Sequence, residues 1–493
     1  MQPFGRYGFG GFTFDTRTRS LSHHGRPIDL TDREAALVAQ LVTRAGRVIP
    51  KEELIPAIWG DVAVTDNSLE QLLSSVRRLL RNIEDAHYVE TLPRRGYRFA
   101  AEVRPLPILT SDDEVMALIA PHRAWLEGRA ALETFDAGQV AGARAAFEQV
   151  LADVPEQASA HLGLANACVM QFEMTRTDVQ PNVAALDLAA VHAREACRLE
   201  PALGESWATL GFVLSRTGRR LDAIAAGRRA IALEPGNWRH HFRLSSIGWG
   251  EERLQAARRT LALLPGFPLA HFLAATVHVA RGAFDEATRE LRAGIASAEM
   301  RGADEPRFSG VALHWLLGLV LAESDDLAGA LTALEHECAL EGSRHLYGRE
   351  CVANSWYAIG ALRLRSGDRA GAGAAFGEAE RRMPRHPGAA IGLVLLDGRG
   401  LEDLARRGAE SEHLSATDRA MGLACVCGAS ALAGRPLPPG VGMELAAAAV
   451  DAALSAAEPG NAGWLLPVEP LIHPSGAPDV WSAALSRLRG RAA

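Results

Sequence analysis

A chain of 493 residues is too long for one hydrophobic core, so we expect two or more domains, or a domain joined to a repeat array. Its 52 basic and 59 acidic side chains leave a net charge of -7, which excludes a whole-molecule field that attracts nucleic acid or anionic membrane. Any basic surface must therefore be local.

Targeting signals are not evident in the sequence. The opening MQPFGRYGFG has no signal-peptide pattern, and six scattered cysteines fit reduced thiols. The longest apolar run, residues 311–322, is shorter than the roughly 20 residues of a membrane span. We therefore expect a cytoplasmic protein with no membrane partner.

The first hundred residues alternate between short strands and helices. We predict strands at residues 12–15 and 28–30, followed by a helix that starts after Thr31 and continues to Gly46. Thr31 and Glu34 form a capping box, in which each side chain satisfies a backbone amide at the helix start. Further helices are predicted over residues 51–59 and 67–81.

The last of these helices is amphipathic, with an apolar stripe of leucines and a valine at helical spacing. Its other faces carry small polar side chains and then arginines: Asn67, Ser68, Gln71, Ser74, Ser75, Arg77 and Arg78. Amides and hydroxyls can read base edges in a DNA major groove, and arginines can hold phosphates. The solvated face of an ordinary amphipathic helix is the alternative, and the helix alone does not separate the two.

A basic β-hairpin is predicted next, from the stretch ETLPRRGYRF. Pro93 and Gly96 supply turn chemistry between two strand-like flanks, which places Arg94 and Arg95 at the tip. Residues 77–98 hold six arginines against three acidic residues, so positive charge is concentrated here. A solvated surface hairpin and a binding site are both compatible with this pattern taken alone.

Helices followed at once by a basic hairpin resemble the winged helix-turn-helix of the OmpR/PhoB-type DNA-binding family. The resemblance covers residues 9–103 and rests on LTDREAALVAQLVTRAGRVI, VTDNSLEQLLSSVRRLL and ETLPRRGYRF. The RRGYRF ending is similar to the one-component CadC/ToxR/HilA-like members. The resemblance implies that the hairpin is a wing whose Arg94 and Arg95 enter a narrow minor groove, while the helix over 67–81 reads the major groove.

Further expectations follow from the resemblance. In the family the loop at residues 60–65 can touch RNA polymerase, although Pro50 stands where a serine cap is usual and Pro56 lies inside the preceding helix. Members of the family often bind tandem or inverted half-sites, so a homodimer is expected. Activation of transcription is expected over repression. No receiver domain fits ahead of residue 9, so input must come from the remaining chain.

The remaining chain is a repeat. The units WATLGFVLSRTGRRLDAIAAGRRAIALEP and WYAIGALRLRSGDRAGAGAAFGEAERRMP resemble the tetratricopeptide repeat, and the LEP ending at Pro201 recurs 34 residues later at Pro235. We expect about seven helix pairs up to residue 384, an insertion near residues 175–182, then degenerate helices. Residues 464–470 are expected to cap the array.

Arrays of this kind curl into a superhelix with a concave face that binds partners. The repeat pattern projects nine side chains onto or near that face: Trp125, Phe135, Phe212, Arg216, Phe272, Trp315, Asn354, Tyr357 and Arg365. Such a groove suits a peptide, a partner protein or a small apolar ligand. Packing between helices is the alternative role for each aromatic side chain.

Enzymatic and metal-dependent functions find no support. No Walker A, G-x-S-x-G or H-E-x-x-H motif occurs, and GAGAAFG falls inside a repeat helix, where close packing explains its glycines. The pairs Cys425/Cys427, His23/His24 and His240/His241 lack a second pair at zinc spacing. We expect no catalysis, no metal and no cofactor.

The fold class predicted is mainly α: an α+β winged helix-turn-helix at residues 1–104, a linker at 105–114, a tetratricopeptide array at 115–385, and degenerate repeats with a cap at 386–493. The predicted function is a transcriptional regulator that binds double-stranded promoter DNA and senses a ligand or partner in the repeat groove. The alternative is an interaction scaffold whose winged helix does not bind DNA. The net negative charge and the acidic Asp66 and Glu70 at the start of the helix predicted to read DNA support it.

Overall fold

A computed structural model describes residues 5–60, 62, 64–84, 86–106, 123, 125–130, 132, 135–300, 310–342, 345–397, 415–437, 441–460 and 462–493. The chain divides into two compact units, Met1–Ile119 and Ala120–Ala493, and each is treated by itself. Within these ranges, none of the helices combines the length and the apolar character that crossing a membrane requires.

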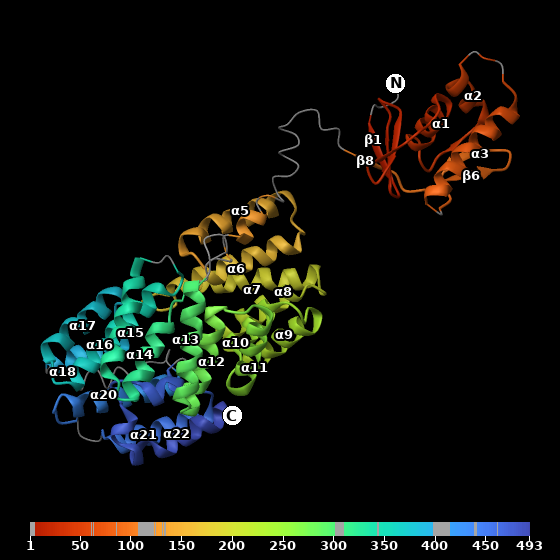
Figure 1. The fold of residues 1–493 in the computed structure, drawn as a ribbon. Coiled ribbons are helices and arrows are strands. Elements are labelled where there is room, and N and C mark those ends of the chain that lie inside the picture. The colour runs from red at the N-terminus through yellow and green to blue at the C-terminus, as the bar shows by residue number, and fades with distance from the viewer. Residues whose placement is uncertain are drawn as a thin grey trace. The chain divides into compact units, whose positions relative to one another are not determined.

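The first unit begins with a five-stranded antiparallel sheet (Figure 1). Its order is β4-β3-β2-β1-β8, from β1 (Arg6–Phe9), β2 (Phe12–Asp15), β3 (Ser20–His23), β4 (Arg26–Ile28) and β8 (Arg104–Leu106). Pro27 and Pro105 lie in the two edge strands, where a missing N–H breaks no ladder. The strand predicted at 28–30 is wrong beyond Ile28, because β4 ends there, and β1, β3 and β8 were not predicted.

Three helices follow: α1 (Asp32–Val42), α2 (Lys51–Trp59) and α3 (Asp66–Ile83). The capping box is confirmed, since the Thr31 hydroxyl accepts from the Glu34 amide and the Glu34 carboxylate accepts from the Thr31 amide at 2.9 Å. α1 ends at Val42, earlier than predicted. Pro50 is the N-cap of α2 and provides no side-chain cap, as its chemistry requires.

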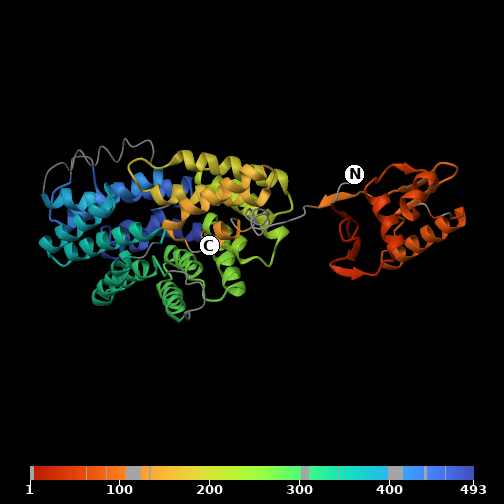
Figure 2. The same ribbon diagram turned by 90° about the horizontal axis from the view of Figure 1, so that it is seen from above.

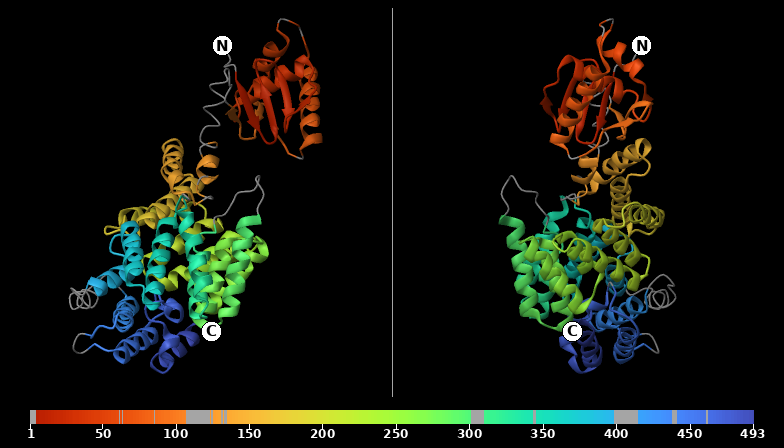
Figure 3. Two further views of the ribbon diagram at one scale, coloured as in Figure 1. Left: turned by 60° about the vertical axis from the view of Figure 1, so that its left-hand side comes forward. Right: turned by 90° about the vertical axis from the view of Figure 1, so that its right-hand side faces the viewer.

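A second sheet of three strands closes the unit, with β5 (Val48–Ile49), β7 (Gly96–Phe99) and β6 (Val89–Leu92) in that order. The predicted hairpin is therefore joined by a third, unpredicted strand. A core of aromatic and aliphatic side chains, including Phe9, Phe14, Leu41 and Phe99, holds both sheets and the helices together. Figure 3 shows the strands of the larger sheet side by side in this unit.

The described residues of the second unit are mainly helical, and successive helices pack side by side along a curved array (Figure 2). Its helices are α5 (Val140–Asp153), α6 (Ala158–Thr175), α7 (Val183–Leu199), α8 (Gly204–Arg216), α9 (Arg220–Leu233), α10 (Trp238–Ile247), α11 (Gly250–Leu263), α12 (Pro268–Arg281), α13 (Phe284–Met300), α14 (Leu313–Glu323), α15 (Leu327–Ala339), α16 (Gly348–Arg365), α17 (Arg369–Arg382), α18 (Pro387–Asp397), α20 (Ala416–Leu432), α21 (Met443–Ala456) and α22 (Pro478–Ala492). Short 3-10 segments are η1 (Ala137–Gln139), η2 (Leu340–Gly342), η3 (Gly463–Val468) and η4 (Pro474–Gly476). The predicted fold class is confirmed.

Small residues set the close approach of paired helices. A Cβ on Gly211 of α8 would lie 2.9 Å from the carbonyl oxygen of Ala223 in α9. A Cβ on Gly360 of α16 would lie 2.6 Å from the ring of Phe376 in α17. Any larger side chain at these two positions would force the helices apart.

Segments distant in sequence meet in this unit. The insertion after α6 reaches α16, where Arg176 pairs with Glu350 at 2.5 Å and Asp178 pairs with Arg349. The last helix α22 lies beside α11 and α12, as Figures 1 and 3 show, and Arg281 donates to the Ala492 carbonyl at 2.6 Å. Contacts between segments distant in sequence thus link the array at two places.

Residues 464–470 lie inside the array and not over its end. Trp464 packs edge-on against Phe272 of α12 and Trp315 of α14, and Glu469 accepts a hydrogen bond from Tyr357 of α16. The segment was expected to cap the array, but its apolar side chains are buried against the inner helices.

Candidate functional site

The helix predicted to read the major groove, α3, has one buried apolar face and one polar face. Leu69, Leu73, Val76 and Leu80 are each 1% exposed and belong to the unit's core. Of the seven polar side chains expected to face DNA, Asn67, Gln71, Ser74 and Arg78 are exposed, while Ser68, Ser75 and Arg77 are half-buried. The helix therefore presents a polar surface that the rest of the unit does not cover.

Ser75 is occupied inside the unit. Its hydroxyl donates to Glu34 of α1 at 2.5 Å. Burial raises the pKa of Glu34, but hydrogen bonds from Ser75 and Thr31 outweigh it and leave the pKa below its ordinary value. Ser75 thus fastens α3 to the start of α1, a role that the helical pattern does not reveal.

Arg77 is also occupied inside the unit. Its Nε donates to the Val89 carbonyl at 3.0 Å, and its terminal nitrogen donates to the Thr91 hydroxyl at 2.7 Å. Both acceptors belong to β6, the first strand of the hairpin. The side chain expected to hold a phosphate therefore holds the wing against the reading helix.

The wing is a tight hairpin with a fixed tip. Leu92 pairs with Gly96, and the Arg95 amide donates to the Leu92 carbonyl at 3.0 Å. Arg94 has φ 63°, in the left-handed region that residues other than glycine adopt only rarely. Gly96 has φ 124°, and a Cβ there would lie 2.2 Å from the Ile49 carbonyl oxygen, so only glycine fits.

Arg94 and Arg95 are both exposed, and neither forms a side-chain hydrogen bond or ion pair within the described part of the chain. Their neighbour Arg98 differs, because it pairs across the strands with Glu90 at 2.6 Å. Two guanidinium groups are thus available at the tip of a rigid turn.

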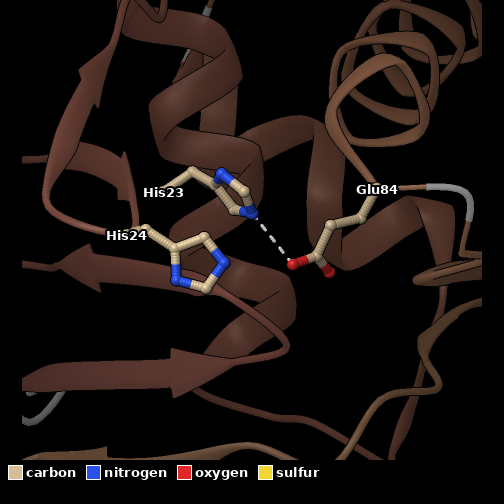
Figure 4. Close-up of side chains that lie close together, drawn as sticks. All are labelled: His23, His24 and Glu84. Carbon is tan, nitrogen blue, oxygen red and sulfur yellow. Dashed lines mark hydrogen bonds and ion pairs between the residues drawn. The ribbon is translucent and has the colours of Figure 1, made fainter.

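A cluster at the far end of α3 ties it to the larger sheet (Figure 4). Glu84 accepts from the Gly11 amide at 2.8 Å, from His23 at 2.9 Å and from the Tyr88 hydroxyl. The ring of His24 lies beside that of His23 and close to the same carboxylate. Sequence reasoning missed Glu84, which is 61 residues from His23, and we interpret the cluster as structural because hydrogen bonds already occupy the carboxylate.

The repeat unit contains the second candidate site, a cavity of about 1670 Å3. Seven of the nine expected groove residues line it: Phe135, Phe212, Arg216, Phe272, Trp315, Asn354 and Tyr357. Trp125 lines a smaller neighbouring pocket, together with Phe135. Arg365 lines neither and bonds His473 at 3.1 Å. Sequence reasoning missed the cavity-lining Arg243 and Arg253, which carry no repeat-pattern signal.

Comparisons with known proteins agree with this organisation. Residues 25–99 match the family described as transcriptional regulatory protein, C terminal, and residues 129–175 match the tetratricopeptide repeat. Both families are of non-enzymatic kinds.

Relatives of known name match the N-terminal unit. The transcriptional regulator HilA of Salmonella typhi is 32% identical over 80 residues, which is 16% of this chain and 14% of that protein. The transcriptional activator CadC of Escherichia coli (strain K12) is 33% identical over 85 residues, 17% of each chain. The solved DNA-binding domain of E. coli CadC is 25% identical, covers 22% of this chain and all of that one, and gives a TM-score of 0.20.

The chain thus spans only a small part of the length of these relatives. It carries at its N-terminus a DNA-binding domain of the OmpR/PhoB-type transcriptional regulatory family, homologous to those of the HilA, CadC and ToxR-like regulators, and tetratricopeptide repeats follow that domain.

Proposed function

We propose that the protein is a sequence-specific transcriptional regulator: its N-terminal unit binds promoter DNA, and its repeat array binds the molecule that controls it. The main support for this proposal is that four polar side chains of α3 are exposed, while Arg77 holds the wing to that same helix. A helix of this kind can lie in a major groove while the wing reaches the adjacent minor groove.

Roles follow from exposure and from internal partners. Asn67, Ser68, Gln71 and Ser74 contact base edges, and Arg78 contacts a phosphate. Arg94 and Arg95 enter the minor groove, whose negative potential favours guanidinium groups. Ser75 and Arg77 act indirectly by positioning the helix and the wing.

Activation is the proposed outcome, because CadC is named as an activator. Contact with RNA polymerase through the 60–65 loop remains a prediction, and residues 61 and 63 of it lie outside the described residues. Homodimer formation, a cytoplasmic location and the 105–114 linker, of which 107–114 lie outside the described residues, also remain predictions.

Selection of bound fragments from genomic DNA, followed by anisotropy titrations of the full chain, tests the proposal. Affinity should fall steeply with salt: the logarithm of the binding constant should decrease with the logarithm of the salt concentration, with a slope of about -0.9 for each neutralised phosphate. Gln71→Ala should reduce affinity for the selected site more than for random duplex. Arg289→Ala is the control, since this arginine is 74% exposed on α13 of the repeat unit.

The scaffold alternative predicts a different result. If no selected duplex binds at low salt, or if binding is insensitive to salt, the N-terminal unit does not use its arginines on DNA. The repeat array would then carry the function alone.

A further inference from the structure

The cavity of the repeat array is large and has aromatic walls. Its volume of about 1670 Å3 exceeds the 300–1,000 Å3 that is usual for small-molecule sites, so it can take a ligand with an extended body. Among the described residues, six aromatic rings from the inner helices and from η3 line it: Phe212, Phe242, Phe272, Trp315, Tyr357 and Trp464. An apolar ligand would replace water against these rings.

Two of the cavity's arginines are neutralised by carboxylates. Arg216 contacts Glu173 at 2.6 Å, and Arg176 lies 3.2 Å from the same carboxylate and 2.5 Å from Glu350. These four side chains form a balanced network with two positive and two negative charges. They need no further counter-ion.

Arg243 and Arg253 are different. Arg243 donates to the Asn166 side chain at 3.0 Å, and its guanidinium lies 4.6 Å from the centre of the Phe212 ring. Arg253 donates to the Ser245 and Gly248 carbonyls and to the Thr276 hydroxyl, each at 3.1 Å. Neither forms an ion pair with any carboxylate among the described residues.

Among the described residues, carboxylates act on these two cations only from beyond ion-pair distance, as Glu205 and Glu173 do on Arg243. Burial lowers the pKa of both guanidinium groups, that of Arg253 to about 10. The carboxylate of Glu458, which acts weakly on Arg253, is paired with Arg220 at 2.5 Å. In the part of the chain that the structure describes, the cavity lining holds six arginines and four carboxylates.

A partly desolvated cation whose hydrogen-bond partners are all neutral is unfavourable, and an anion that enters the cavity would offset part of that cost. Both arginines are half-buried and line the cavity, so a ligand can reach them. A guanidinium group is suited to carboxylate and phosphate because its N–H groups can form paired hydrogen bonds with their oxygens.

We propose that the cavity binds a small amphipathic anion, whose aromatic or acyl body packs among the rings and whose anionic group pairs with Arg243. The binding itself is independent of DNA; only the role of the anion as the controlling ligand rests on the proposed function.

Two fluorescent probes that differ by one charged group test the proposal on the full chain without DNA. 8-Anilinonaphthalene-1-sulfonate carries a sulfonate, and N-phenyl-1-naphthylamine has the same body without it. Because no DNA is present, failure of promoter binding cannot affect the result.

A matched pair of substitutions isolates the charge. Ser246 lines the cavity three residues after Arg243 on α10, where a side chain can reach that arginine. Ser246→Glu supplies an internal anion, and Ser246→Gln has the same shape without the charge. The affinity of Ser246→Glu for the sulfonate probe should be lower than that of Ser246→Gln by about tenfold or more, while the neutral probe binds both variants alike.

Arg243→Gln should give the same selective loss, and circular dichroism reports whether each variant is folded. Competition by dodecanoate and by dodecyl phosphate then distinguishes a carboxylate from a phosphate ligand. The proposal is overturned if Ser246→Glu and Ser246→Gln bind the sulfonate probe equally, if both probes weaken together, or if neither competitor displaces the probe.

Discussion

Arg77 of α3 and Val89 of β6 are joined by a hydrogen bond of 3.0 Å from the guanidinium to the backbone carbonyl. The same guanidinium reaches the Thr91 hydroxyl, so one side chain spans the first strand of the wing. The groups proposed for the major groove and for the minor groove are therefore held in one fixed geometry. Such preorganisation lowers the ordering cost of binding.

Replacing Arg77 with lysine should loosen the wing. Lysine keeps the charge but lacks the planar fork that serves two acceptors at once, so about 1–2 kcal/mol of local stability should be lost. Amide hydrogen exchange in residues 89–99 should become faster, and DNA affinity should fall. Arg78→Ala is the contrast, because this exposed side chain should leave exchange unchanged and reduce the salt slope by about 1. Unchanged exchange in Arg77→Lys would show that the Arg77 hydrogen bonds to β6 do not hold the wing.

The wing tip allows charge and backbone to be separated. Arg94 has φ 63°, so Arg94→Gly removes the guanidinium at a position where glycine adopts the backbone conformation without steric strain. Together with Arg95→Gln it should weaken promoter binding while the melting temperature stays the same or rises slightly. An unaltered affinity of this double variant would remove the minor-groove role from both arginines.

Gly96→Ala provides the converse test. The added Cβ would meet the Ile49 carbonyl oxygen at 2.2 Å, so the β5–β7 pairing must shift while both wing arginines remain. Calorimetry should show a destabilised first unit. If Gly96→Ala is as stable as the unsubstituted chain, the close approach to β5 is incorrect.

The helices of this fold could be predicted because their signals are local. The Thr31 and Glu34 capping box, the helix 51–59 and the repeat prolines each act within a few residues of the feature they determine. Strands β1, β3, β5 and β8 have two to four residues each and little hydrophobic alternation, so their pairing depends on partners far along the chain.

The candidate sites divide in the same way. The repeat pattern pointed to Phe212, Phe272 and Trp315, which line the cavity. It could not show that Ser75 is bound to Glu34, 41 residues away, or that Trp464 turns into the array. Those contacts arise from tertiary packing, which no repeat period encodes.

Tyr88 and Glu84 predict an acid dependence for the first unit. Hydrogen bonds, that from Tyr88 first, lower the pKa of Glu84, and burial together with Glu84 raises the pKa of Tyr88 to about 12. A carboxyl whose pKa is lowered by folding stabilises the folded state at every pH above its ordinary pKa of about 4.3. This contribution is lost as the pH falls through the folded pKa.

Tyr88→Phe keeps the buried ring and removes the hydroxyl. The variant should melt at a lower temperature near pH 7, and the difference from the unsubstituted chain should shrink toward about pH 3. Tyr7→Phe is the control, because Tyr7 lies in β1 outside this cluster. A difference that does not change with pH would mean that the hydroxyl does not act on Glu84.

Glu469 predicts the opposite dependence in the repeat unit. Burial raises its pKa to about 7, although hydrogen bonds from Tyr357 and the Leu471 amide act to lower it. A carboxyl with a raised folded pKa contributes stability that is fully present below about pH 4.3 and is lost as pH rises through about 7. Glu469→Gln keeps an acceptor for Tyr357 and cannot ionise, so its melting temperature relative to the unsubstituted chain should rise from about pH 4.3 to about pH 7 and change little above that. The exposed Glu444→Gln on α21 should show no such gain, and a constant offset for Glu469→Gln would mean that the carboxyl does not change its charge in this range.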